Sequence, residues 1–289
     1  MTPEDPGYAP MTLDQAWRRS LAEHPGLARL DAGMLLLHVL GRNPHERAWL
    51  LSHGNDPLPA TTLQQFETLC AQRRDQVPLA YLLGRTEFYG LPLLITNHVL
   101  DPRDDTETLV DWALSLMPDD ATLEVIDLGT GSGAIALALQ HQRPRARVWA
   151  VDRCPEALAV ARQNGEALGL PVHWLAGNWL TSIPAAQRFA LIVSNPPYIP
   201  AEDPHMPALR HEPRQALVSG TDGLDDIRCL VGQAPGHLRP GGWLLLEHGH
   251  DQSTAVQDLL RQAGFEDVQS RPDLAGIPRC TGGRWPGMK

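Results

Sequence analysis

The sequence has almost no lysine and few cysteines. Of its 24 basic residues only Lys289 is a lysine, and the others are arginines. The four cysteines (Cys70, Cys154, Cys229 and Cys280) are far apart and match no Cys-x-x-Cys metal spacing. We therefore expect neither a zinc site nor a disulfide framework, and no metal at the functional site.

Long hydrophobic runs are also missing. No uninterrupted apolar stretch approaches the roughly 20 residues that a membrane-spanning helix needs. The first ten residues, MTPEDPGYAP, lack the basic and apolar regions of a signal peptide. These two features predict a cytoplasmic protein with no membrane partner.

A net positive charge is the third absence. The chain carries 34 acidic and 24 basic residues, a formal charge of −10. This balance argues against a whole-surface electrostatic grip on nucleic acid, so no direct nucleic-acid partner is expected. With 289 residues and 43% hydrophobic content, the chain is long enough to bury a sizeable core.

The pattern of the chain changes twice along its length. Apolar residues at three- and four-residue spacing predict helices from residue 12 to about residue 74. Short β-like runs separated by glycine and proline then predict a hairpin. After a helix with Asp105 or Thr106 as candidate N-cap, strands alternate with helices, which indicates an α/β fold with a mostly parallel twisted sheet. We expect a helical domain over residues 1–76, a β-hairpin linker over 77–104 and an α/β domain over 105–289.

A glycine turn follows the first strand of the predicted α/β domain. In VIDLGTGSGAIALAL, Gly129, Gly131 and Gly133 stand between strand and helix, where the backbone turns tightly and helix N–H groups are unpaired. Nineteen residues later the second strand ends at Asp152, whose carboxylate can accept hydrogen bonds from both ribose hydroxyls. The pattern indicates an adenosine-containing ligand. Two readings fit: a dinucleotide, through Gly-x-Gly-x-x-Ala, or S-adenosyl-L-methionine, through Asp-x-Gly-x-Gly-x-Gly from Asp127.

The third strand of this domain ends in Asn178 and Trp179. An amide at that position can hydrogen-bond the adenine amino group, and an indole can stack on the ring. A tryptophan at a strand end is equally typical of a core residue, so both interpretations stay open.

The fourth strand ends in Asn195-Pro196-Pro197-Tyr198. A planar NH₂ nitrogen has a delocalised lone pair, so a methyltransferase must hold its hydrogens in acceptors; the Asn195 side-chain oxygen and the Pro196 carbonyl are suited to this. The prolines fix φ, and Tyr198 supplies a flat wall. Because this turn and the glycine turn are expected to end neighbouring strands, we predict that they share one pocket. A dehydrogenase would leave this turn unexplained, and a non-enzymatic binding module would leave both turns unexplained.

The flanking segments carry a resemblance to a known family. From about residue 12 to the C-terminus, the sequence resembles the peptide chain release factor N5-glutamine methyltransferases. The segments that carry this resemblance are EFYG, DTE, SNPPYI, HEPRQALVSGTDGLD and EHG with a glutamine three residues later. The Asn-Pro-Pro-Tyr turn alone also fits ribosomal-protein glutamine methyltransferases and DNA or RNA N6-adenine methyltransferases. An adenine methyltransferase would need a basic recognition surface, whereas residues 1–104 carry twelve acidic and nine basic residues.

The resemblance implies a Rossmann-like methyltransferase domain that uses S-adenosyl-L-methionine and releases S-adenosyl-L-homocysteine. The implied substrate is the glutamine of a Gly-Gly-Gln loop in class 1 peptide chain release factors, gripped in part by the N-terminal domain, with an effect on translation termination. Asn178 stands where the family commonly has an acid. Carried over by position, the cofactor-binding residues are Asp127, Gly129, Thr130, Gly131, Ser132, Gly133, Asp152, Arg153, Asn178, Trp179 and Asn195; Asn195, Pro196, Pro197 and Tyr198 bind substrate, and Asn195, Pro196 and Tyr198 are catalytic.

Four polar residues in the last third of the chain receive simpler interpretations. Glu247 and His248 end a predicted strand and are expected to hydrogen-bond the fold rather than to act in catalysis. Glu212 and Asp222 follow the tyrosine of the turn and are expected to lie near the substrate entrance.

Overall fold

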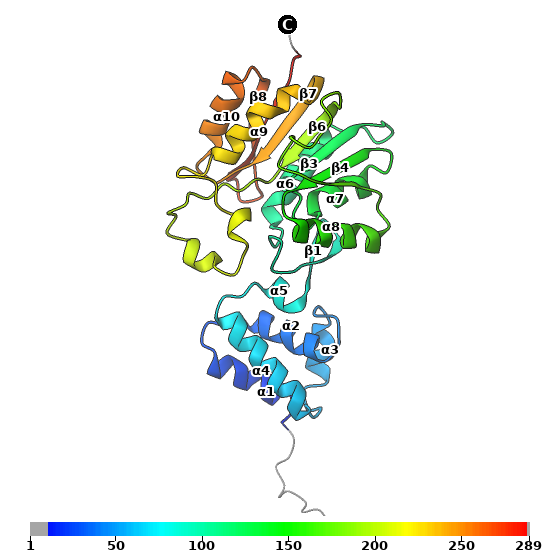
Figure 1. Cartoon of the computed structure of the whole chain (residues 1–289). Helices are drawn as coiled ribbons and strands as arrows, with labels where there is room; N and C mark the ends of the chain where they lie inside the picture. Colours follow the sequence, from blue (N-terminus) through cyan, green and yellow to red (C-terminus); the bar gives the residue numbers. More distant parts are fainter. Residues whose placement is uncertain (1–10, 288–289) are drawn as a thin grey trace, which may run out of the picture. The chain divides into compact units, whose positions relative to one another are not determined.

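The computed structural model describes residues 11–287 and divides into two compact units, one ending at Gly84 and the other beginning at Arg85 (Figure 1). Residues 1–10, on which the absence of a signal peptide was argued, lie outside the described residues, as do residues 288–289. Within residues 11–287 no helix combines the length and the apolar character that a bilayer crossing requires.

The first unit is helical, as the apolar spacing predicts. Thr12 begins it with a capping box, because its hydroxyl accepts from the backbone N–H of Gln15 while the Gln15 side chain accepts from the backbone N–H of Thr12. Buried leucines from several helices pack around Phe66 and Cys70 to form its core. The helices are α1 (Leu13–Glu23), α2 (Arg29–Val39), α3 (Arg47–Ser52), α4 (Ala60–Arg74) and α5 (Leu79–Leu83).

The second unit opens with the predicted hairpin. Strands β1 (Arg85–Phe88) and β2 (Leu91–Leu94) are antiparallel, and the chain reverses between them through two residues with positive φ, Tyr89 at 51° and Gly90 at 75°. The division between the units falls before this hairpin, and the separate linker role of residues 77–104 stays a prediction.

The helix after the hairpin has Thr106 at its N-cap position, as expected, but the Thr106 side chain does not cap it. A 3₁₀ turn, η1 (Asp104–Thr106), leads into α6 (Glu107–Ser115), with Thr106 at the N-cap position. Its φ of −66° and ψ of −21° are helical, and its side chain makes no capping hydrogen bond. The Thr106 hydroxyl is therefore free for another partner.

A seven-stranded sheet forms the centre of the second unit, in the order β5-β4-β3-β6-β7-β9-β8. The pairs from β5 to β7 are parallel, and β9 pairs antiparallel with both β7 and β8. The mostly parallel α/β fold expected from the sequence is confirmed. The strands are β3 (Glu124–Leu128), β4 (Arg147–Asp152), β5 (His173–Ala176), β6 (Phe189–Ser194), β7 (Leu238–Glu247), β8 (Glu266–Pro272) and β9 (Pro278–Arg284).

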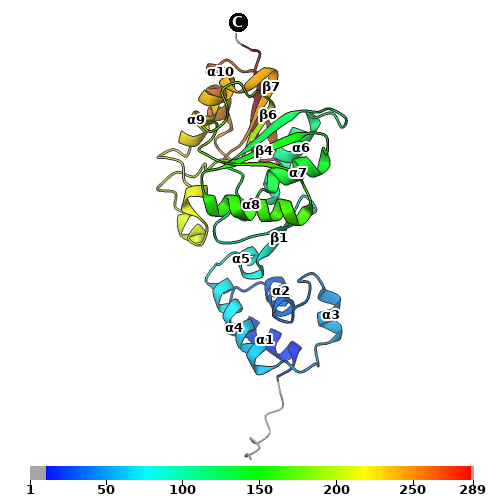
Figure 2. The same cartoon turned by 45° about the vertical axis from the view of Figure 1, so that its right-hand side comes forward.

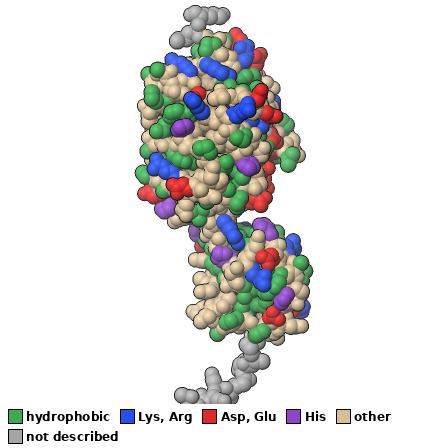
Figure 3. All heavy atoms as spheres, turned by 90° about the vertical axis from the view of Figure 1, so that its right-hand side faces the viewer, with side chains coloured by type: hydrophobic (Ala, Val, Ile, Leu, Met, Phe, Trp, Pro, Cys, Tyr) green, Lys and Arg blue, Asp and Glu red, His purple; other side chains and the backbone are tan. Residues whose placement is uncertain are grey.

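Helices cover both faces of this sheet. Figure 2 shows α9 (Asp225–Gln233) and α10 (Ser253–Gln262) on one side, and α6, α7 (Ala134–Gln142) and α8 (Pro155–Leu168) on the other. The central strands β3 and β6 are mostly apolar and buried on both faces, as is typical of parallel sheets; β6 is buried along its whole length, whereas the edge strands β5 and β8 are not. On the face drawn in Figure 3, acidic and basic side chains are interspersed.

The sheet order brings the two sequence motifs together. Strand β3 pairs directly with β6, and Leu128 is the register partner of Ser194. The Ser194 hydroxyl also donates to the Leu128 carbonyl at 2.6 Å. The glycine turn and the Asn195 turn thus leave adjacent strands at the same edge, where ligands of open α/β sheets bind.

Candidate active site

The carboxyl edge of β3, β4 and β6 opens into a pocket, here called the cofactor pocket, with about 910 Å³ of space including its open side. Ten predicted site residues line it: Gly129, Thr130, Gly131, Ser132, Asp152, Arg153, Asn178, Trp179, Asn195 and Pro197. A second pocket, the acceptor pocket, adjoins it and is lined by Leu100, Arg103, Asn195, Tyr198, Ile199, Leu209, Ala216 and Leu217.

The glycine loop has three residues with positive φ: Gly129 at 72°, Gly131 at 56° and Gly133 at 85°. A Cβ on Gly131 would meet no atom within 4 Å, so this part of the loop faces open space. A Cβ on Gly129 would lie 3.1 Å from the Trp179 ring, and one on Gly133 would lie 3.1 Å from the Trp174 ring. Gly131 leaves the main chain open to a ligand, while the missing Cβ atoms of Gly129 and Gly133 allow the Trp179 and Trp174 rings to pack closely.

Asp127 lies behind this loop and is fully buried. Its Oδ2 accepts from the Thr130 hydroxyl at 2.6 Å and from the Ala136 N–H at 3.2 Å. Its Oδ1 has no hydrogen-bond partner in the described part of the chain, and burial raises the pKa of the carboxyl to about 7. Asp127 therefore holds the loop and the first turn of α7 and does not line the pocket.

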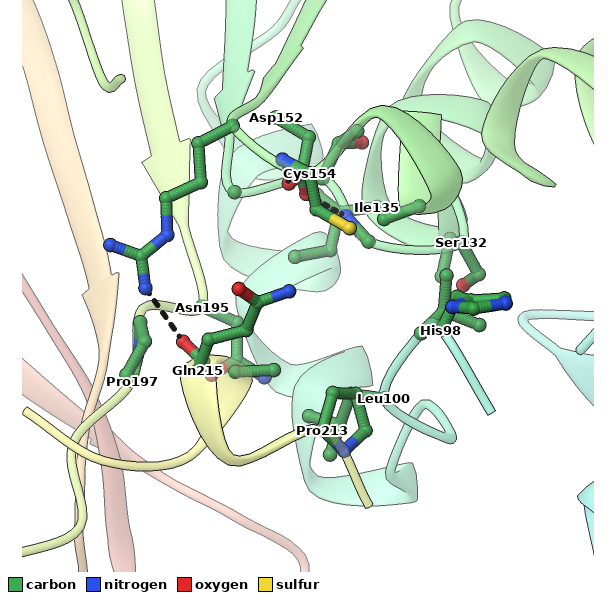
Figure 4. Close-up of a pocket in the computed structure, with 18 of the residues that line it drawn as sticks. His98, Leu100, Ser132, Ile135, Asp152, Cys154, Asn195, Pro197, Pro213 and Gln215 are labelled. Atoms are coloured by element: carbon green, nitrogen blue, oxygen red, sulfur yellow. Dashed lines mark hydrogen bonds between the residues drawn. The ribbon is translucent and has the colours of Figure 1, made fainter. Parts of the chain in front are cut away.

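Asp152 occupies the end of β4, directly in the pocket (Figure 4). Its Oδ2 accepts from the Gly131 N–H at 2.8 Å, and its Oδ1 accepts from the Cys154 N–H at 2.9 Å. A carboxylate oxygen has two lone pairs, so each oxygen retains one after these bonds. Asp152 thus fixes the glycine loop and keeps acceptor capacity.

Asn178 and Trp179 follow β5 and line the cofactor pocket from another side. Asn178 is exposed. The Trp179 indole is only 7% exposed, packs in the core with the α9 residues and donates its N–H to Asp226 Oδ1 at 3.2 Å. The structure gives this tryptophan a core position as well as a place in the pocket wall, and its predicted stacking on a base stays a prediction.

Asn195 lines both pockets and marks the boundary between them. Its Nδ2 donates to the Thr106 hydroxyl at 3.2 Å. This bond uses the donor side of the carboxamide within the protein. The acceptor oxygen is left for a ligand.

The remaining residues of the turn are divided between the pockets. Pro197 lines the cofactor pocket, Tyr198 lines the acceptor pocket, and Pro196 is buried and lines neither. The Tyr198 carbonyl accepts from Gln252 Nε2 at 3.0 Å, and a Cβ on Gly223 would lie 2.2 Å from the same carbonyl oxygen. Gln252 and Gly223 therefore fix the position of the Tyr198 backbone.

Sequence reasoning missed the residues that close the cofactor pocket on its outer side. Figure 4 shows Pro213 and Gln215 across the pocket from Asp152 and Cys154. Arg153 Nη2 donates to the Gln215 carbonyl at 3.0 Å. Their segment, HEPRQALVSG, contributed to the family resemblance, but nothing in its residues predicted a place in the pocket wall. The other lining residues without a prior assignment are His98, Val99, Leu100, Pro102, Thr106, Ala134, Ile135, Cys154, Ala157, Gly177 and Ala216.

The two acids expected near the entrance form ion pairs. Arg103 Nη2 donates to both Glu212 oxygens, at 2.6 and 2.7 Å, and this ties the outer segment to the acceptor pocket. Asp222 pairs with Arg228, whose hydrogen bonds lower the pKa of Asp222 to about 2. Glu212 thus holds Arg103, which lines the acceptor pocket, whereas Asp222 and Arg228 form an ion pair on the exposed surface.

The strand-end pair Glu247 and His248 separates into two roles. His248 is buried, with Nδ1 at 2.8 Å from the Gly249 carbonyl and Nε2 at 2.7 Å from the Thr281 hydroxyl, which is the structural role expected. Glu247 is 1% exposed and lies under the Asn195 turn, where Tyr198 Oη donates to its Oε1 at 3.4 Å. Its position next to the site was not expected.

Comparisons with known proteins agree with this geometry. Residues 13–84 match the family model of the PrmC N-terminal domain, and residues 106–219 match that of the methyltransferase small domain. The chain is 49% identical over 267 residues to the release factor glutamine methyltransferase of Bordetella pertussis, covering 92% of this chain and 98% of that protein. It is 48% identical to the Xylella fastidiosa (strain Temecula1) protein of the same name, covering 91% and 95%.

A solved structure supports the fold. The Thermus thermophilus 16S rRNA N2 G1207 methyltransferase, in complex with AdoMet and guanosine, aligns with a TM-score of 0.53 and 21% identity over 70% of this chain and 49% of that chain. At this identity the likeness concerns the fold alone.

Proposed function

The chain belongs to the release factor glutamine methyltransferase family, and we propose that it methylates the side-chain amide nitrogen of the glutamine in the Gly-Gly-Gln loop of class 1 release factors. Membership of this family confirms the resemblance seen in the sequence. The observation that carries the proposed site is the position of Asn195, which lines the cofactor pocket on one side and the acceptor pocket on the other. A group there can contact both reactants of a direct transfer.

The residues of the cofactor pocket fit S-adenosyl-L-methionine. Open space above Gly131 admits a ligand to the main chain, and Asp152 retains acceptor capacity for the ribose hydroxyls. Ile135 and Ala157 provide apolar wall. Asp127 acts indirectly in this proposal, through the loop it holds. When bound, the cofactor supplies an electrophilic methyl group.

The acceptor pocket holds the glutamine amide in this proposal. Asn195 Oδ1 accepts one amide hydrogen, and the carbonyl of Pro196, a residue that lines neither pocket in this structure, is the predicted acceptor of the second. This leaves the nitrogen lone pair facing the cofactor pocket. The Tyr198 ring forms a wall of this pocket, and the Gln252 amide keeps its backbone in place. The protein contributes orientation and acceptors for an in-line displacement, in which the amide nitrogen gains the methyl group and one of its two hydrogens leaves as a proton to solvent. We expect the reaction to occur in the cytoplasm, where release factors act, with the first unit helping to grip the protein substrate.

A methyl-transfer assay with alternative acceptors tests the proposal. Purified protein and S-adenosyl-L-methionine labelled in the methyl group are incubated with a class 1 release factor, with the same factor carrying Ala in place of the loop glutamine, with ribosomal proteins and with DNA. We expect label only in the factor with the intact glutamine. Label in DNA or in a ribosomal protein, or equal label in the two factors, would overturn the proposal.

A further inference from the structure

Thr106 and Glu247 are two buried polar residues beside Asn195 to which the proposed function assigns no role. Thr106 is 3% exposed and stands at the N-cap position of α6 without capping it. Its hydroxyl oxygen instead accepts from Asn195 Nδ2 at 3.2 Å. A hydroxyl has a single hydrogen, and while the oxygen faces the amide donor of Asn195, that hydrogen points to a different acceptor.

Glu247 has a buried oxygen available for that hydrogen. It ends β7, whose residue Leu246 is the register partner of Ser194 on β6, so its carboxylate lies beside the start of the Asn195 turn. Its Oε1 accepts from Tyr198 Oη, and its Oε2 has no hydrogen-bond partner among residues 11–287. Burial raises the pKa of Glu247 to about 7, and the nearby Thr106 and Tyr198 hydroxyls oppose this rise.

We propose that Glu247 and Thr106 are positioning residues that set which end of the Asn195 carboxamide faces the acceptor amide. Glu247 takes the Thr106 hydrogen, so the Thr106 oxygen receives Asn195 Nδ2. Asn195 Oδ1 is then turned toward the substrate NH₂, as an acceptor. The inference deepens the proposed function and depends on it.

Replacing the acceptor oxygen of Glu247 with a donor reverses the direction of each hydrogen bond in this chain. In Glu247→Gln the new amide NH₂ donates to the Thr106 oxygen, whose hydrogen turns toward Asn195. The Asn195 carboxamide then presents NH₂ to the substrate NH₂, and two donors face each other. The cofactor pocket is unchanged, because Glu247 does not line it.

The test compares Thr106→Val, Thr106→Ser, Glu247→Gln and the double variant Thr106→Val/Glu247→Gln. Asp111→Asn on α6 is the matched control, since Asp111 also accepts a tyrosine hydroxyl, from Tyr89 at 2.7 Å. For each protein, kcat is measured with saturating release factor, the Kd of S-adenosyl-L-homocysteine by calorimetry, and Tm by thermal melting.

We expect Thr106→Val and Glu247→Gln to lower kcat at least tenfold with Kd changed less than about threefold. Thr106→Ser keeps kcat within about threefold of the wild type, and Asp111→Asn leaves it unchanged. The kcat of the double variant is no lower than that of the less active single variant, because both residues act through one bond. Should Glu247→Gln not fold, the Val and Ser variants of Thr106 decide the matter.

Three results would overturn the inference. They are an unchanged kcat in Thr106→Val, a loss of kcat in Thr106→Ser equal to that in Thr106→Val, and a kcat loss in the double variant equal to the product of the two single losses. These outcomes differ from failure of the proposed function, in which the wild-type protein itself transfers no methyl group to the release factor.

Discussion

Asp152→Ala tests whether the carboxylate at the end of β4 contacts the cofactor ribose. The same side chain accepts two backbone N–H groups, from Gly131 at 2.8 Å and from Cys154 at 2.9 Å. Its replacement therefore has two effects. One is the loss of a direct bond to a ribose hydroxyl, and the other is a looser glycine loop. Affinity for the cofactor product alone does not separate them.

The size of the direct effect follows from the charge on the acceptor. A hydrogen bond to a charged group contributes about 1.5–3 kcal/mol. Because about 1.4 kcal/mol corresponds to a factor of ten in Kd, one such bond is equivalent to roughly 10- to 150-fold in affinity. The loop effect acts on any ligand of the pocket, whether or not it carries the hydroxyl.

A cycle of two proteins and two ligands separates the effects. Calorimetry gives the Kd of S-adenosyl-L-homocysteine and of its 2′-deoxy analogue for wild type and Asp152→Ala, with the exposed Asp258→Asn on α10 as a control for charge. We expect the wild type and the control to lose at least tenfold on removal of the hydroxyl, and Asp152→Ala to lose less than threefold. An equal penalty in wild type and Asp152→Ala would refute the ribose contact and leave Asp152 as a loop-holding residue.

Three other predictions concern the turn and the buried acid. Asn195→Ala should lower kcat by about 10²-fold or more through loss of an acceptor, with the Kd of S-adenosyl-L-homocysteine changed by less than about tenfold in calorimetry; near-normal turnover would contradict it. Gly223→Ala places a Cβ 2.2 Å from the Tyr198 carbonyl oxygen at a φ of +78°, so melting should show Tm lower by about 4 °C or more, and an unchanged Tm would argue against it. Asp127 has a folded pKa of about 7 against 3.8 for the free group, so its contribution to stability is full below pH 3.8 and is lost as pH rises to 7, by at most about 4 kcal/mol. Urea midpoints between pH 5 and 8 should therefore fall less in Asp127→Asn than in wild type, and parallel curves would refute this assignment.

The sequence predicted the sheet and the meeting of its two motifs. Strands β3 and β6 are short apolar runs separated by helical segments, and such runs pair in parallel at the centre of a doubly wound sheet. Because ligands bind where these strands end, the positions of Gly131, Asp152 and Asn195 in one pocket followed from periodicity and connection order alone.

The sequence predicted the N-cap position of Thr106 but not the partner of its hydroxyl, and it assigned no structural role to the outer wall. A threonine before an apolar helix is typical of an N-cap, but Thr106 is bonded to Asn195, 89 residues later in the chain. The Arg103 and Glu212 pair joins segments 109 residues apart. Local patterns do not contain such distant partners, since each residue alone is compatible with an exposed position.

Apolar spacing and glycine positions thus determined the fold class and the edge of the sheet at which the two turns meet, because backbone geometry and strand pairing are written in local sequence. The Asn195 to Tyr198 turn predicts a planar NH₂ nitrogen as the methyl acceptor. Tertiary structure alone decided that Asp127 lies behind the loop, that residues 213–216 close the pocket and that Thr106 accepts a hydrogen bond from the Asn195 amide. These depend on burial and on hydrogen bonds between residues that are brought together only when the sheet is complete.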